Sequence, residues 1–455
     1  MSKKWLPFLL SIAILLIPAQ TAFAAPRANV TNNQVVFDFP NTATFSATIN
    51  ADSDIALITL EYGNIQQTCG EVVAKAYPDF TPGKTVNVEW TWDMRQSGSL
   101  PPGATIWWRW IYTDATGKES STDVQTAAWL DDVHDWQTIS SGDLRLHWYD
   151  NDKTFAQTML DAGVEGLRRN KEQAGLTTED PIDLYVYPNY DDMKDAILYE
   201  PSWTGGMAFP EYNIFIMGVS QSDSTWDQNT VIHELTHILV GHLTFSCLGD
   251  VPTWLNEGLA MYSEGELDSG AQAQLDQAIS SDTLLTVRSL NGGFSELPDK
   301  ANLSYSQSYS IVNFLIKTYG QDKLTELLTA LRDAKTIDDA LLEIYGFDSD
   351  GLEDAWRGSV GAAPRAVSAQ ATAMPTPTFV PTYVPVAGIP LAVTPTPYAI
   401  PTSSSDGSNL PLDDNTPSLI ILTIALVCVC IVFLLIIGVV VLTFVIRSQK
   451  AGKNG

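Results

Sequence analysis

The segment 233–237 has the sequence His-Glu-Leu-Thr-His, and nineteen residues separate its second histidine from Glu257. On a helix, His233 and His237 lie four residues apart and project from one face, about one turn from each other. That spacing lets both imidazoles reach one zinc ion, while Glu234 points to one side of the metal, where it can deprotonate a water. Glu257, on a second helix, would be the third ligand. Three protein ligands leave a fourth position open, as in a catalytic zinc site.

The distribution of histidine supports this interpretation. The chain has only five histidines, and three of them, including His242, fall within ten residues. His242 follows His237 by five residues, so on a helix its side chain points away from the histidine pair. A helix-end or supporting role is the favoured interpretation of His242, and a ligand role is the alternative.

Together these residues resemble the metal motif of the gluzincin metallopeptidases, the group that contains thermolysin and the zinc aminopeptidases. The spacing from His237 to Glu257 is similar to that of the thermolysin group, whereas the amino-acid sequence of residues 254–264 is more similar to that of the aminopeptidases. The resemblance covers residues 140–358, about half of the chain. It implies one bound Zn²⁺ ion, with the two histidines and Glu257 as ligands and Glu234 as the general base.

The same resemblance suggests an oxyanion donor. Tyr305-Ser-Gln-Ser-Tyr309 is similar to the Tyr-x-Lys-Gly stretch that supplies a phenol in the aminopeptidases, with Gln and Ser in place of Lys and Gly. Tyr305 is the candidate, Tyr309 is its competitor, and two core tyrosines at a helix start are the structural alternative. Glu264 is either a carboxylate that supports the metal ligands or a solvated surface residue.

Substrate-binding residues are expected just before the active helix. Gly206-Met207-Ala208 resembles part of the aminopeptidase Gly-x-Met-Glu-Asn segment. Ala208 stands where that segment has the carboxylate that grips a free amino terminus, which favours internal cleavage. A strand is expected at 213–217, and in gluzincins such a strand is the edge along which an extended peptide pairs. Gly206, Met207 and Asn213 are therefore the predicted substrate-binding residues.

The amino-terminal part predicts an all-β domain over residues 28–135. Apolar and polar residues alternate there, and turn residues recur every eight to twelve positions, as in a β-sandwich of immunoglobulin or fibronectin III type. Trp107, Trp108 and Trp110 could form a platform that stacks sugars, but sandwich core is the favoured interpretation.

From residue 140 the pattern changes to strands followed by helices, which predicts an α+β metallopeptidase lobe over 140–358 with a helical carboxyl-terminal part. The active helix should begin at Ser224 or Thr225, because both are good N-cap residues. The other expected elements are strands at 144–149, 182–187 and 213–217, and helices at 154–173, 190–198, 305–319, 322–334 and 337–345.

The two ends of the chain predict export and membrane attachment. Residues 1–24 contain two lysines, a short apolar run and Ala-Phe-Ala, which is typical of a cleaved signal peptide. Eleven prolines at 361–417 indicate an extended or disordered Pro/Thr-rich stalk. Residues 419–446 have no charge and predict one transmembrane helix, and the basic tail 447–455 should stay in the cytoplasm. The catalytic part would be extracellular, in a single-pass protein of the cell membrane.

Charge and cysteine content restrict the partners. The formal net charge of −28 argues against nucleic acid as a partner, because phosphates would be repelled. Cys428 and Cys430 lie inside the predicted span, whereas Cys69 and Cys247 lie in different predicted domains. Whether the latter two form a disulfide stays open, and nothing in the sequence predicts an oligomeric state.

These observations favour a membrane-anchored, outward-facing zinc metallopeptidase that hydrolyses a peptide or protein substrate by a metal-activated water. Two alternatives remain: a catalytically idle surface adhesin or sensor, and a zinc hydrolase that acts on a non-peptide amide. The intact Glu234 argues against an idle module, because a binding module has no need of that carboxylate.

Overall fold

The computed structural model describes residues 29–365, apart from 71, 99, 151, 199–204, 220–223 and 296. The expected signal peptide, the expected membrane span, the tail and all of the stalk beyond residue 365 lie outside these residues. Within the described residues, no helix is both long enough and apolar enough to traverse a bilayer.

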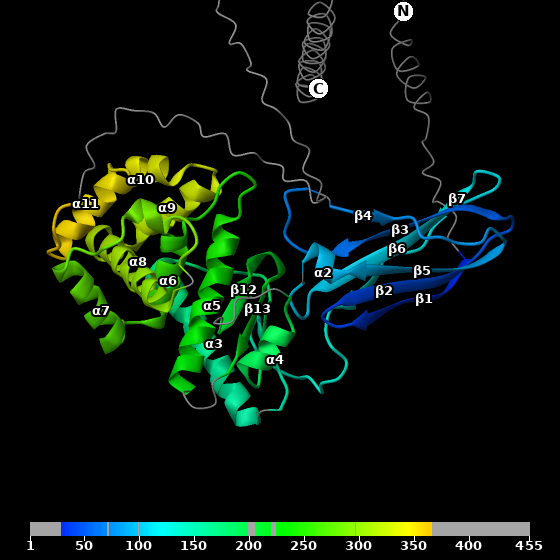
Figure 1. Ribbon diagram of the computed structural model, residues 1–455, viewed down its shortest axis with the longest axis horizontal. Coiled ribbons are helices and arrows are strands. Elements are labelled where there is room, and N and C mark those ends of the chain that lie inside the picture. The colour runs from blue at the N-terminus through cyan, green and yellow to red at the C-terminus, as the bar shows by residue number, and fades with distance from the viewer. Residues whose placement is uncertain are drawn as a thin grey trace, which may run out of the picture. The chain divides into compact units, whose positions relative to one another are not determined.

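The amino-terminal domain consists of two antiparallel sheets (Figure 1, blue to cyan arrows). One sheet has the order β1-β2-β5, with β1 (Asn29–Asp38), β2 (Thr42–Asn50) and β5 (Thr85–Asp93). The other has the order β4-β3-β6-β7, with β8 also paired to β6. Its strands are β3 (Ile55–Asn64), β4 (Ala74–Ala76), β6 (Thr105–Asp114), β7 (Glu119–Ser121) and β8 (Gln125–Ala128). A single-turn helix, α2 (Met94–Ser97), follows β5.

The tryptophans of β6 pack in the interior of this domain. Burial alternates along the strand, as expected for a strand with one face against a core. Trp108 and Trp110 are buried, and the indole N–H groups of both donate to Oδ1 of Asn33, at 2.8 and 3.1 Å. Trp107, on the other face, lies close to Gly63, its partner on β3, where an added Cβ would meet the indole Nε1 at 3.1 Å. The core interpretation therefore holds for Trp108 and Trp110.

A third sheet belongs to the carboxyl-terminal lobe and has the order β12-β13-β11-β10-β9. Strands β10, β11 and β13 are parallel, and the two outer strands are antiparallel to their neighbours. The strands are β9 (Gln137–Ser141), β10 (Leu144–Trp148), β11 (Ile182–Tyr187), β12 (Gly206–Phe209) and β13 (Ile214–Gly218). Helix α3 (Lys153–Ala174) connects β10 to β11, and α4 (Tyr190–Asp195) follows β11.

Each face of this sheet enters a different apolar core, because successive strand residues point to opposite sides. Leu184 and Phe215 pack on the side of the helices, in the core that also contains residues of α3 and of the later helices. Tyr185 and Ile216 pack in the core of the amino-terminal sandwich. The sheet is thus covered on both faces, which explains why β11 and β13 are almost entirely apolar and buried.

One expectation about this sheet is wrong. The strand expected at 213–217 is β13, and it lies between β12 and β11 rather than at the edge. Within the described part of the chain, the edge beside β13 is formed by β12, which folds back onto β13 through a 3-10 turn, η1 (Pro210–Tyr212), with Asn213 in the left-handed region at φ 58°. The sequence gives little sign of β12, because its four residues, Gly-Met-Ala-Phe, include two poor strand formers.

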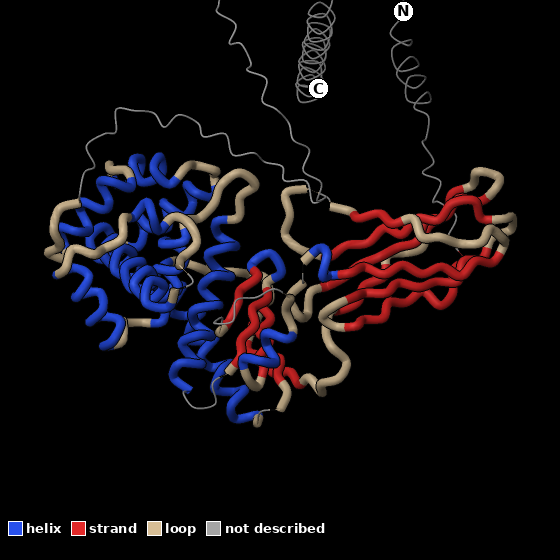
Figure 2. Tube along the Cα trace, in the orientation of Figure 1, coloured by secondary structure: helices blue, strands red, loops and turns tan. Residues whose placement is uncertain are grey.

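The rest of the lobe is helical (Figure 2, blue). Its elements are α5 (Ser224–Thr244), α6 (Thr253–Glu264), α7 (Ser269–Ser280), η2 (Val287–Leu290), α8 (Pro298–Tyr319), α9 (Gln321–Arg332), α10 (Ile337–Tyr345) and α11 (Ser349–Ser359). Gly320 and Gly346 end α8 and α10 at positive φ, as expected from the sequence. Helix α8 begins at Pro298, seven residues before the expected start, because proline suits the first helical position.

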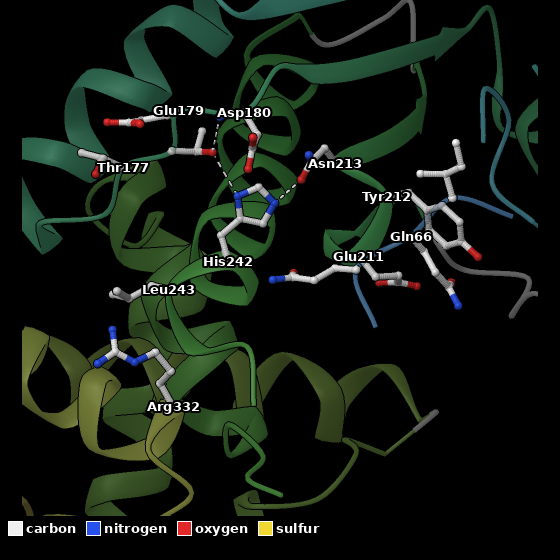
Figure 3. A pocket seen from close by; sticks show the side chains of 13 residues that line it. Gln66, Thr177, Glu179, Asp180, Glu211, Tyr212, Asn213, His242, Leu243 and Arg332 are labelled. Atoms are coloured by element: carbon white, nitrogen blue, oxygen red, sulfur yellow. Dashed lines mark hydrogen bonds between the residues drawn. The ribbon is translucent and has the colours of Figure 1, made fainter. Parts of the chain in front are cut away.

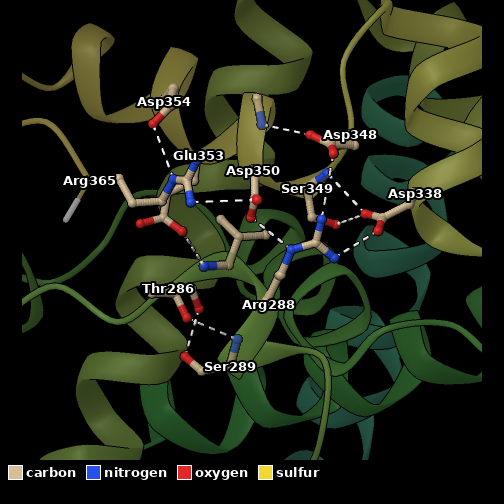
Figure 4. Close-up of polar contacts among 12 residues, drawn as sticks. Thr286, Arg288, Ser289, Asp338, Asp348, Ser349, Asp350, Glu353, Asp354 and Arg365 are labelled. Atoms are coloured by element: carbon tan, nitrogen blue, oxygen red, sulfur yellow. Dashed lines mark hydrogen bonds and ion pairs between the residues drawn. The ribbon is translucent and has the colours of Figure 1, made fainter. Parts of the chain in front are cut away.

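A polar cluster ties the η2 turn to the last two helices (Figure 4). The Arg288 guanidinium lies 2.7 Å from a carboxylate oxygen of Asp338 and 2.7 Å from one of Asp350. These ion pairs are exposed, so each contributes at most about 1 kcal/mol. Deeper in the cluster, the buried Glu353 accepts a hydrogen bond from the amide of Val287 at 3.0 Å. The η2 turn therefore has a fixed place in the lobe.

A disulfide connects the sandwich to the lobe. Cys69, in the loop between β3 and β4, is bonded to Cys247, in the connection between α5 and α6, across 178 residues of sequence. The amide of Gln67 in the same loop donates to the carbonyl of Glu211 in η1 at 2.8 Å. The two cysteines therefore form a disulfide, which the sequence left open. In the sequence, Cys247 lies between the two helices that carry the metal motif.

Candidate metal and catalytic site

Helices α5 and α6 bring the three predicted metal ligands together. His233 and His237 project from one face of α5, with ring centroids 4.8 Å apart and ring planes at 82°. Oε2 of Glu257, on α6, lies 3.3 Å from Nε2 of His233 and 3.4 Å from Nε2 of His237. The opposite face of α5 carries the buried Leu235 and Leu239, which fix the helix against the core. The histidines are therefore directed out of the core and toward α6.

The residues of this group fit a zinc ion. Oε2 of Glu257 is buried and accepts no hydrogen bond, although both imidazoles are near it. A buried, unsatisfied carboxylate oxygen is costly unless a cation compensates it. His233, His237 and Glu257 offer ligand atoms that all lie within 4.8 Å of one another. Two imidazole nitrogens and one carboxylate oxygen are a donor set that suits catalytic zinc.

Outer hydrogen bonds orient both imidazoles. Nδ1 of His233 lies 2.7 Å from Oε1 of Glu264, and Nδ1 of His237 lies 3.0 Å from Oδ1 of Asn256. Since both partners are oxygen acceptors, each Nδ1 carries the proton and each Nε2 presents its lone pair to the shared centre. Glu264 thus supports the ring of His233, as one of its two predicted roles required. Asn256 supports the ring of His237 in the same way, and the sequence analysis did not predict this role. The signal for Asn256 was its position immediately before Glu257.

Glu234 has the surroundings of a general base. Glu234 is 8% exposed and lies between the two histidines in the sequence. Together with His233 it lines a cavity, which is described below. Burial raises the pKa of Glu234 even though the imidazoles of His233 and His237 oppose this effect. A raised pKa makes the carboxylate a better proton acceptor near neutral pH. For Glu257 the balance is reversed: burial alone would raise its pKa, but the imidazoles of His237 and His233 lower it.

Of the two candidate tyrosines, Tyr305 is the one that reaches the site. Its ring centroid lies 6.4 Å from that of His233, and its ring packs edge-on against Phe294 at 5.1 Å. Burial, followed by the charge of Glu257, raises the pKa of Tyr305, so the phenol stays protonated and can donate. Tyr309, one turn along α8, packs beside Tyr262 instead. Tyr305 also lies within α8, rather than at its start as the sequence suggested.

The predicted ligands His233, His237 and Glu257 are called the metal group below. A cavity of about 730 Å³ opens beside this group. Elements β12, α5, α6, α7 and α8 contribute its walls, which include Gly206, Trp226, His233, Glu234, Met261, Glu264, Asp268, Gln274, Asn302 and Tyr305. Gly206 lies directly against Glu234, the predicted general base, because a Cβ added there would come within 2.9 Å of Cγ and Oε1 of Glu234. The predicted residue Gly206 is thus at the site, where the absence of a side chain leaves room next to Glu234.

The other two predicted substrate-binding residues lie elsewhere. Met207 points to the opposite face of β12 and packs against the apolar core of the sandwich. The side chain of Asn213 binds Nε2 of His242, and both line a separate cavity of about 560 Å³ (Figure 3). Nδ1 of His242 bonds Thr178 at 3.0 Å. His242 therefore has a structural role at the end of α5, and neither it nor Asn213 reaches the metal group.

One comparison with known protein families matches this part of the chain at the level of a superfamily. Residues 162–362 match the family model described as Peptidase MA superfamily, a segment that contains both histidines, Glu234, Glu257 and Tyr305. A comparison with curated protein sequences found none that matches this chain.

Three solved structures show slight similarity. A mutant M1 zinc metallopeptidase from Deinococcus radiodurans is 12% identical, with a TM-score of 0.35 over 72% of this chain and 92% of that one. The catalytically inactive OgpA from Akkermansia muciniphila, in complex with an O-glycopeptide, is 12% identical, with a TM-score of 0.18 over 25% of this chain and 32% of that one. A bromine derivative of BhCBM56 is 10% identical, with a TM-score of 0.16 over 23% of this chain and 95% of that one.

The metal group predicts a sharp difference between two histidines of α5. Replacing His237 with alanine should remove most of the zinc, because only two ligands remain, whereas His242→Ala should keep it. Elemental analysis of the purified proteins checks this, with about one zinc per chain expected in the wild type. Equal zinc content in the His237→Ala and wild-type proteins would rule out the ligand assignment.

Proposed function

We propose that residues 162–362, which match the model of the peptidase MA superfamily, form the core of a zinc-dependent metallopeptidase that hydrolyses peptide bonds. One observation carries the proposal: the ligand atoms of His233, His237 and Glu257 converge around a buried carboxylate oxygen that has no hydrogen-bond partner, with Glu234 beside them. These three residues would hold the ion. When bound there, zinc would act as a Lewis acid that lowers the pKa of a water molecule and polarises the substrate carbonyl.

Glu234 moves the proton in the proposed reaction. Its carboxylate accepts a proton from the attacking water and then returns it to the nitrogen of the departing amine. Both transfers need a group whose pKa lies closer to neutrality than that of an ordinary glutamate. Burial of Glu234 beside Gly206 supports this role, because it raises the pKa of the side chain in the required direction.

Tyr305 stabilises the negative charge that develops on the carbonyl oxygen. A protonated phenol aimed at the reacting centre is a preorganised donor and acts without rearrangement of the site. The raised pKa of Tyr305 and its place on the wall of the same cavity as Glu234 support this assignment. Phe294 packs against this ring in a T-shaped contact.

The free edge of β12 aligns the substrate. Among the described residues, this strand pairs with β13 on one side only, so its other edge can accept an extended peptide as an additional strand. Gly206 at the start of β12 touches Glu234, which brings a peptide paired there close to the general base. The four residues of β12 include no carboxylate that would bind a free amino terminus, and this supports internal cleavage.

We also propose that the enzyme is exported and held at the outer surface of the cell membrane by residues 419–446. The signal-like residues 1–24 and the basic tail after the apolar stretch support this orientation. The disulfide between Cys69 and Cys247 supports export as well, because such bonds persist in oxidising compartments.

Replacing Glu234 with glutamine tests the reaction directly. The amide keeps the size of the side chain but cannot accept the proton, so we expect kcat to fall by about 10²–10⁴-fold while zinc is retained. Mass spectrometry of a peptide mixture, with and without a chelator, measures the cleavage. Wild-type rates in the Glu234→Gln protein would disprove the role of Glu234 as the base.

A second substitution tests the oxyanion donor. Tyr305→Phe should lower kcat by about 10²–10³-fold with unchanged zinc content, because one preorganised donor is lost. Tyr309→Phe is the matched control and should stay within about twofold of the wild type, since Tyr309 lies outside the cavity. Equal losses in both variants would contradict the assignment to Tyr305.

Truncation tests the proposed anchoring. A chain that ends at residue 417 should appear in the medium of a secreting host as active enzyme, while the full chain should sediment with membranes. Quantitative immunoblotting of the two fractions is sufficient. Recovery of the truncated chain in the membrane fraction only would overturn the proposed topology.

A further inference from the structure

A buried hydrogen-bond network joins α3 to both helices of the metal group. Its centre is Asn170 on α3, whose side chain has no exposure to solvent. Nδ2 of Asn170 donates to Oγ1 of Thr236 on α5 at 2.9 Å, and Oδ1 accepts from Oγ of Ser263 on α6 at 3.0 Å. One amide therefore binds both helices at once.

The direction of every hydrogen bond in the network is determined. Oγ1 of Thr236 donates to the carbonyl of Ile232 at 2.8 Å, so it can only accept from Asn170. The second Nδ2 proton of Asn170 goes to the carbonyl of Gly166 at 3.0 Å. With both donors and the acceptor in use, the amide has one orientation. Neither a carboxylate nor an apolar side chain at this position can make the same three bonds.

The network ends next to one predicted metal ligand and next to a residue that orients another. Thr236 immediately precedes His237, and Ser263 immediately precedes Glu264, whose carboxylate holds the ring of His233. The neighbouring Arg169 adds to the same support, because its Nη1 donates to the carbonyl oxygens of Ser263 at 3.2 Å and Glu264 at 2.6 Å. The last turn of α6 is thus held from α3 through both a side chain and the backbone.

Close packing of the helices makes this support stiff. A Cβ added to Gly166 on α3 would lie 3.0 Å from Cδ2 of Leu235 and 3.4 Å from Cγ1 of Ile232, so α3 and α5 approach closely at this point. Asn170 lies one turn further along α3, where α6 joins the contact. A shift of either metal-bearing helix would break hydrogen bonds that have no solvent to replace them.

We propose that Asn170 is a positioning residue of the metal site, which sets the distance between the imidazoles on α5 and the carboxylates of Glu257 and Glu264 on α6. The inference rests on the proposed function, because it concerns the affinity of the same three ligands for zinc. Groups that orient metal ligands commonly change metal affinity by about 10–100-fold when removed. Asn170 acts one step further out, through Thr236 and Ser263.

The test compares two serine-to-alanine substitutions that each remove one buried hydrogen bond. Ser263→Ala removes the bond to Asn170, whereas Ser310→Ala removes the bond that Nε1 of Trp356 makes to Ser310 at 3.0 Å, between α8 and α11. Asn170→Ala completes the set. Zinc affinity is measured by competition with a chelator, the ligand geometry by the visible spectrum of the Co²⁺ form, and folding by thermal unfolding of the metal-free proteins.

We expect Asn170→Ala to bind zinc about 10-fold more weakly, Ser263→Ala several-fold more weakly, and Ser310→Ala within about twofold of the wild type. The Co²⁺ spectrum should change in the first two variants and not in the third. Wild-type affinity and spectrum in both Ser263→Ala and Asn170→Ala would overturn the inference, whatever their melting temperatures.

Three outcomes separate the possible explanations. If Asn170→Ala does not fold, the comparison of Ser263→Ala with Ser310→Ala decides alone, because each change is a single hydroxyl. If the wild-type protein itself binds no zinc, the proposed function fails together with this inference. If the wild type binds zinc and the Asn170 and Ser263 variants bind it equally well, only the positioning role fails.

Discussion

The carboxylate of Glu257 is costly to bury, because one of its oxygens lies between two imidazoles and accepts no hydrogen bond. An unsatisfied buried polar atom costs roughly 1–3 kcal/mol, and a charged one costs more. Contacts elsewhere in the fold must therefore offset this cost and hold α5 and α6 in their relative position. A cation bound by the three ligands removes the cost, which couples metal binding to the stability of this arrangement.

Three separate parts of the structure fix the position of these two helices. Asn170 binds the middle of α5 and the end of α6 from α3. At the start of α6, Nε1 of Trp254 donates to Asn291, which directly follows the η2 turn held by the Arg288 cluster. The disulfide of Cys247 holds the connection between the helices against the sandwich. The sandwich thus contributes to the site although none of its residues lines the metal cavity.

Features that depend on local sequence could be predicted, whereas those that depend on distant contacts could not. The strand Ile182–Tyr187 and the helix Ile337–Tyr345 have the expected bounds, because periodicity and capping residues lie within each segment. The histidine pair follows from helical spacing alone. Asn170 gave no signal, since an asparagine near the end of a helix is ordinary until its partners, 66 and 93 residues away, are known. The pairing of Cys69 with Cys247 was undecided for the same reason.

The misplaced edge strand shows how this difference affects the active site. A prediction from hydrophobicity selects β13, the apolar strand, but an apolar strand is favoured in the interior of a sheet with two covered faces. The edge is left to β12, whose glycine weakens the strand signal. That same glycine is what permits close approach, because any side chain at Gly206 would collide with Glu234. The residue that weakens the strand signal in the sequence is therefore the one that leaves room beside Glu234 for the peptide of the proposed reaction.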